Sequence, residues 1–79
     1  MNYSIKELIE RACAFSIESA ELANIISSSG DKDLESEKKL FACKQKYAES
    51  LEVLRLADQN GFEHNKAKVV EITRMAMQR

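Results

Sequence analysis

The sequence predicts an all-α protein: an antiparallel helical hairpin followed by a shorter third helix, arranged like a three-helix bundle. The 79-residue chain contains two glycines and no proline, so Gly30 and Gly61 are its strongest helix breakers. In the three segments that these glycines separate, apolar residues recur at spacings of three, four and seven, as in amphipathic helices. We therefore expect one helical domain, residues 1–79, with helices at about 4–28, 32–59 and 63–78.

The first helix, residues 4–28, begins with a capping sequence. Ser4 and Glu7 have the spacing of a capping box, in which the Ser4 side chain accepts a hydrogen bond from the Glu7 amide. Tyr3 and Leu8 occupy the two positions of a hydrophobic staple. An apolar row with seven-residue spacing then runs along the segment: Met1, Leu8, Phe15 and Leu22.

The second helix, residues 32–59, is apolar on more than one side. Asp31 or Asp33 is its expected N-cap, and Asn60 with Gly61 suits its C-terminal end. The stripe that should face the first helix consists of Leu40, Cys43, Tyr47, Leu51 and Leu54. A second row, about 100° around the helix from the first stripe, consists of Leu34, Phe41 and Ala48. A helix with two apolar sides needs more than one neighbour.

The third helix, residues 63–78, is the shortest. Glu63 or Asn65 should cap it, and Val69, Ile72 and Ala76 should face inward. At 1.5 Å per residue the three helices span roughly 37, 43 and 24 Å, so the third can cover only part of the hairpin. Because it follows the end of the second helix, it should pack near the start of the first.

The hairpin end near Gly30 is therefore the expected protein interface. The apolar residues around this tip are Leu22, Ile25, Ile26, Leu34 and Phe41. Ile17 and Leu56 join this interface set because they lie off the stripes that build the core. A chain this short has a thin core and gains stability from a partner, so we expect an oligomer, for instance a homodimer.

Composition argues against several classes of function. Twelve basic and 13 acidic residues give a net charge of −1, which removes the usual electrostatic basis for binding nucleic acid or anionic membranes. No apolar run approaches the roughly 20 residues of a membrane span, and the first ten residues carry charges unlike a signal peptide. Cys13 and Cys43 are too few for a disulfide scaffold, so we expect free buried thiols in a cytoplasmic protein.

The sequence offers little catalytic chemistry. His64 is the only histidine, and its position near the start of the third helix suits an exposed or capping role. Motifs for phosphate, dinucleotide or zinc binding are missing from the sequence. The acidic segment 31–35 resembles the opening of a calcium loop but lacks the glycine at loop position six. We expect no enzymatic activity, no cofactor and no metal.

One polar position near the apolar stripe leaves two interpretations open. Lys44 lies almost opposite Ser16 in the hairpin register, where the pair could form a polar layer that sets register. Alternatively, Lys44 extends its ammonium group to solvent along the apolar surface, which is the more common arrangement.

These observations favour a non-enzymatic helical module for protein–protein interaction, such as a small adaptor, regulator or chaperone, that binds itself or another protein. The alternative is a small nucleic-acid-binding regulator that uses the basic residues of the third helix: Lys66, Lys68, Arg74 and Arg79. Near-neutral net charge counts against the alternative.

Overall fold

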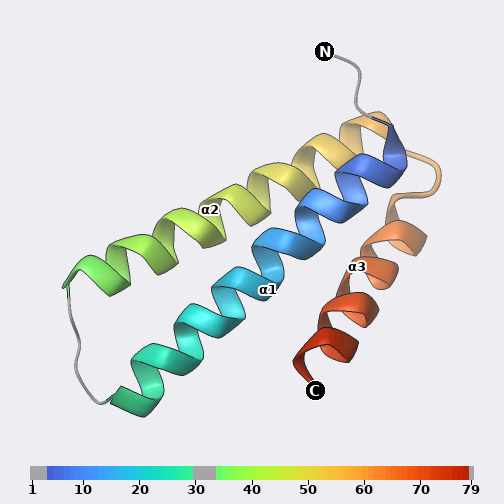
Figure 1. Cartoon of the computed structure of the whole chain (residues 1–79). Coiled ribbons are helices and arrows are strands. Elements are labelled where there is room, and N and C mark those ends of the chain that lie inside the picture. Colours follow the sequence, from blue (N-terminus) through green and yellow to red (C-terminus); the bar gives the residue numbers. More distant parts are fainter. Residues whose placement is uncertain (1–3, 30–33, 79) are drawn as a thin grey trace.

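The computed structural model describes residues 4–29 and 34–78, and this part of the chain contains three helices and no strand. Helix α1 spans Ile5–Ser29, α2 spans Leu34–Ala57 and α3 spans Phe62–Met77. Helices α1 and α2 form an antiparallel hairpin, and α3 runs back beside α1 (Figure 1). Several residues of the sequence analysis lie outside the described residues: Met1, Tyr3, Gly30, Asp31, Asp33 and Arg79.

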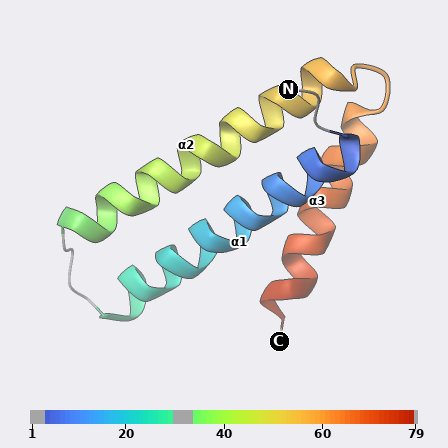
Figure 2. The ribbon, with the colours of Figure 1, turned by 45° about the horizontal axis from the view of Figure 1, so that its top comes forward.

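Helix α1 is the central element of the fold. It packs along α2 on one side and against α3 on another, whereas α2 and α3 make few contacts with each other. Figures 1 and 2 show α3 diverging from α1 toward its C-terminal end. The molecule therefore differs from a closed three-helix bundle, in which every pair of helices would pack.

The first turn of α1 is capped as the sequence predicts. The Glu7 amide donates to the Ser4 hydroxyl oxygen at 3.2 Å, and the Leu8 amide donates to the Ser4 carbonyl oxygen at 3.0 Å. These bonds satisfy two amides that lack partners inside the helix. The capping sequence thus sets the start of α1 at Ile5.

The core of the described residues is small. Its fully buried apolar side chains include Leu54 of α2 and Val69 of α3. Val69 packs with Ala12 and Cys13 of α1, and Ile9, Tyr47 and Leu51 border this cluster. As expected from the order of elements, α3 therefore packs near the start of α1. Ile72, in contrast to the predicted inward position, is 39% exposed.

Asp58 organises the turn between α2 and α3. Its carboxylate accepts hydrogen bonds from the Gly61 amide, at 3.0 Å, and from the Asn65 side-chain amide. Asn65 therefore does not cap α3, whose N-cap is Gly61. Gly61 has φ −108°, outside the left-handed region. A Cβ there would lie 2.7 Å from Asp58 Oδ2, so any other residue would displace the Asp58 carboxylate from its present position.

The helix boundaries lie within one or two residues of the predicted ones, and the two at the α2–α3 turn have a clear cause. Helix α2 ends at Ala57, and α3 begins at Phe62. Both shifts follow from Asp58: its amide makes the last helical bond of α2, to the Leu54 carbonyl oxygen, while its carboxylate holds the next residues in a turn.

Replacing Leu54 by alanine should lower the free energy of unfolding by about 2–5 kcal/mol, because the side chain is fully buried and leaves a cavity. Urea denaturation followed by circular dichroism measures the loss. Leu56→Ala is the matched control: this leucine is 59% exposed and the change should cost less than about 0.5 kcal/mol. Equal losses for the two variants would contradict the packing of α2.

Removing the Asp58 carboxylate should destabilise the α2–α3 turn. We expect Asp58→Ala to cost about 1–2 kcal/mol, because the Gly61 amide and the Asn65 side chain both lose their acceptor. Hydrogen exchange should show the loss of protection concentrated in α3. The neighbouring exposed Gln59→Ala is the control, and an equal effect there would refute the role of Asp58.

Candidate functional site

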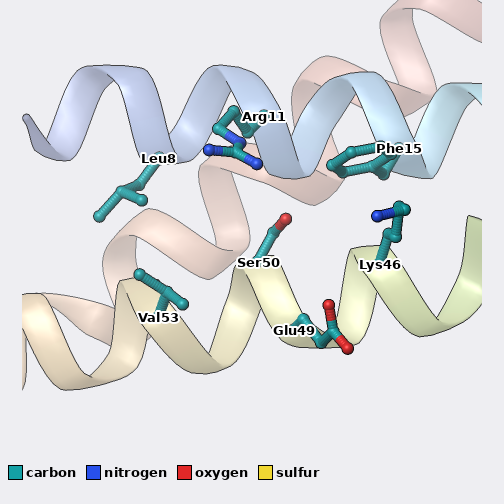
Figure 3. A pocket seen from close by; sticks show the side chains of 7 residues that line it. All are labelled: Leu8, Arg11, Phe15, Lys46, Glu49, Ser50 and Val53. Carbon is teal, nitrogen blue, oxygen red and sulfur yellow. The ribbon is translucent and has the colours of Figure 1, made fainter. Parts of the chain in front are cut away.

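Two adjoining hollows lie between α1 and α2. One hollow of about 140 Å³ (Figure 3) is lined by Leu8, Arg11, Phe15, Lys46, Glu49, Ser50 and Val53. A second hollow of about 530 Å³ is lined by Phe15, Glu18, Leu22, Lys39, Ala42, Cys43 and Lys46. Phe15 and Lys46 line both, so the two hollows adjoin. We call this combined surface the hairpin groove.

Helical spacing explains why these residues share one surface. On each helix the lining residues recur mainly every three or four positions, from Leu8 to Leu22 on α1 and from Lys39 to Val53 on α2. Tyr47 lies only one residue, or about 100°, from Lys46, yet it packs at the cluster around Val69 of α3. The hairpin therefore has two faces, and α3 covers the one opposite the groove.

Figure 3 shows this arrangement directly: the α3 ribbon lies behind the two helices whose side chains line the hollow. Phe15 from α1 and Lys46 from α2 point toward each other across the space. Ser50, which is buried, directs its hydroxyl toward α1. The groove thus combines an apolar floor with charged groups of both signs, from Arg11, Glu18, Lys39, Lys46 and Glu49.

The predicted interface residues occupy different parts of the surface. Leu22 is half-buried and lines the hairpin groove, and Ile26 is half-buried as well. Ile17 is also half-buried, and it lines a hollow with Ala76 and Met77 at the end of α3, away from the tip. The residues with large exposed fractions are Ile25, Leu34, Phe41 and Leu56, of which Phe41 is 71% exposed.

The residues expected at the tip do not form one continuous patch. Phe41 lies two positions after Lys39, a groove residue, and is therefore about 160° away around α2. Leu34 precedes Phe41 by seven residues and shares its side of the helix. Ile25 follows Glu18 by seven residues and so continues the groove side of α1. The tip residues thus belong to opposite faces of the hairpin.

Most of the groove could not be predicted from the sequence. Phe15 belongs to a predicted apolar row, but Arg11, Lys46 and Glu49 lie among ordinary surface charges. The available signal was the seven-residue repeat of Arg11, Glu18 and Ile25 beside the apolar row of α1. The sequence left two interpretations for Lys44. The residue is exposed, in agreement with extension of its ammonium group to solvent.

The basic residues of α3 are accompanied by acidic ones. Lys66 and Arg74 line a shallow hollow with Glu63 and Glu71, and Lys68 is exposed. Among residues 4–29 and 34–78, no group of three or more potential metal ligands comes together. In the same ranges, none of the helices combines the length and apolar character needed to cross a membrane.

Both cysteines are free and buried, as the sequence predicts, and each lies at one of the two contacts of α1. The Cys43 thiol donates to the Phe15 carbonyl oxygen at 3.3 Å, and Cys13 Sγ lies 3.9 Å from the Val69 carbonyl oxygen. Burial raises the pKa of both thiols, and the nearby carboxylates of Glu10 and Glu18 act in the same direction on Cys13 and Cys43, respectively. Both side chains are therefore packing groups that favour the protonated form.

Comparison with protein-family models, with curated proteins and with solved structures finds no match to this chain.

The raised thiol pKa values predict a loss of stability in alkaline solution. Because the fold favours the protonated thiols, their contribution is complete below the ordinary thiol pKa of about 8.5 and declines as the pH rises above it. Urea midpoints between neutral and alkaline pH measure this decline. The Cys13→Ala, Cys43→Ala double variant should show a smaller decline, and an identical pH dependence in the two proteins would contradict the assignment.

Proposed function

We propose that this chain is a non-enzymatic helical module that binds proteins through exposed apolar surface. The observation that carries the proposal is the contrast between a small core and a large set of exposed apolar side chains. In the described part of the chain these exposed residues are Ile25, Leu34, Phe41, Val53, Leu56, Val70, Ile72 and Met75. Single exposed apolar residues are ordinary, but this number in so short a chain favours an interaction surface.

The energetics of apolar burial support this role. Taking one large apolar side chain from water to a fully buried position contributes about 1.5–3 kcal/mol. Val53 is 46% exposed at the edge of the hairpin groove, beside the apolar floor formed by Leu8 and Phe15. A partner that fills the groove gains this burial without unfolding any part of the chain.

The charges of the groove suit a protein partner better than a polyanion. Arg11, Lys39 and Lys46 alternate with Glu18 and Glu49, so the groove does not present a row of cations along a phosphate backbone. Two free buried thiols are compatible with a reducing compartment, and we propose that the module acts in the cytoplasm.

The alternative function, nucleic-acid binding through α3, has weaker support. Glu63 and Glu71 share the hollow that Lys66 and Arg74 line, which reduces its positive potential. Retention on heparin at low salt, lost as salt rises and abolished by Lys66→Gln with Lys68→Gln, would favour this alternative over protein binding.

Site-specific photo-crosslinking in cells tests the proposed function. A benzophenone amino acid is placed at Val53 in the groove or at Phe41 on the other hairpin face, and Gln59, an exposed polar position in the turn after α2, serves as the control. We expect protein adducts from an apolar position and none from Gln59, because contact should follow the apolar surface. The proposal fails if neither apolar position produces a protein adduct, or if Gln59 produces the same adducts.

A further inference from the structure

The molecule exposes more surface than its mass requires. Its accessible area is 5967 Å², whereas a compact folded protein of 9.0 kDa exposes about 4,850 Å². Its radius of gyration is 13.7 Å, compared with about 11.6 Å expected for this length. The excess area, about 1,100 Å², is close to the roughly 800 Å² that each partner contributes to a standard interface. A single additional interface would therefore bring the chain to normal compactness.

The uncovered face of the hairpin is where such an interface fits. Helix α3 covers the opposite face, and the molecule measures only 17 Å in its thinnest dimension. Along the groove face, Leu8, Phe15 and Leu22 form an apolar row on α1, and Val53 stands at the edge of α2. In Figure 3 the side chains that line this face stand in front of the α3 ribbon.

The order of charges along the groove is complementary to itself. The Cys43 thiol bonds to the Phe15 carbonyl oxygen, and Figure 3 shows Lys46 across from Phe15, so residues at the same height in the hairpin have numbers that sum to about 60. Arg11 therefore lies level with Glu49, and Glu18 lies level with the stretch between Lys39 and Lys46. Arg11 on α1 thus stands at the height of an acidic residue on α2, whereas Glu18 stands between the heights of two basic residues on α2.

This pattern matches a second copy of the same chain. A two-fold axis parallel to the helices would place α1 of one copy over α2 of the other, antiparallel and at the same height. Arg11 then faces the partner's Glu49, and Glu18 lies between the heights of the partner's Lys39 and Lys46. The exposed Val53 stands level with the first turns of the partner's α1. An axis perpendicular to the helices would instead place α1 against the partner's α1 and α2 against the partner's α2.

We infer that the hairpin groove is the interface of a homodimer, in which two hairpins pack face to face around an axis parallel to α1 and α2 and α3 lies on the outside of each copy. This inference rests on the proposed function and names a second copy of the chain as the partner. The resulting four-helix layer resembles other bundles in which paired hairpins bury a shared core.

Sedimentation equilibrium of the purified chain tests the interface. At submillimolar concentration the wild type should have twice the 9.0 kDa mass of one chain. Val53→Glu should weaken association at least about tenfold, because a charge then stands on the apolar edge of the groove. Phe41→Glu is the matched control on the other side of α2 and should leave the dimer intact. Circular dichroism verifies that both variants are folded.

Charge exchange tests the relative orientation of the two copies. Arg11→Glu and Glu49→Arg should each weaken self-association, since each brings like charges together twice in the symmetric dimer. An equimolar mixture of the two variants should recover dimers that contain one chain of each kind. Pairing of Arg11 with Glu49 inside one chain cannot produce this recovery, because mixing leaves the contacts within each chain unchanged.

The outcomes separate this inference from the proposed function. A wild type that stays monomeric, a dimer that survives Val53→Glu or is broken by Phe41→Glu, or no recovery on mixing would each overturn the proposed dimer. If the monomeric chain still forms an adduct with a different protein from position 53, protein binding stands and the second copy is excluded. If it forms neither a dimer nor any adduct, both proposals fail.

Discussion

The packing of α1 against two neighbours is the constraint on which the rest of the structure depends. Ala12 and Cys13 are adjacent in sequence and both buried, and Val69 of α3 closes the cluster that they form. Two residues after Cys13, the Phe15 carbonyl oxygen accepts a hydrogen bond from the Cys43 thiol of α2, while the Phe15 ring lines the groove. The small side chains of Ala12 and Cys13 let neighbouring helices approach α1 closely. Helix α1 can therefore pack against both α2 and α3 although it buries little side-chain volume.

Because α2 and α3 both pack against α1, they make few contacts with each other, and one face of the hairpin remains uncovered. Helix α3 starts at Phe62 and its end lies near Ile17 and Glu21, so it covers one face of the hairpin over part of its length. The Asp58 carboxylate determines how the chain leaves α2, through its bonds to Gly61 and Asn65. A local turn thus decides which hairpin face is covered, and the other face becomes the groove.

Much of the fold could be predicted from local signals. The Ser4 cap, the break near residue 61, the shortness of the last helix and its contact with the start of α1 follow from helix capping, glycine and chain length. The groove could not be predicted in the same way. Of the seven residues expected at the interface, Leu22 lines the groove, whereas Phe41 lies nearly opposite the Lys39 side of α2. Both are apolar residues of a predicted row, and the pattern alone does not say which row a neighbour covers.

The sequence by itself determined the number of helices, the start of the first one and the burial of two free thiols, because these depend on residue type and on spacing along one helix. Only the tertiary structure decided the role of each helix face. A shift of one residue turns a side chain by about 100°, so Tyr47 packs near α3 while Lys46 lines the groove. That choice depends on the rotation of each helix and on the Asp58 turn, which are properties of the packed molecule.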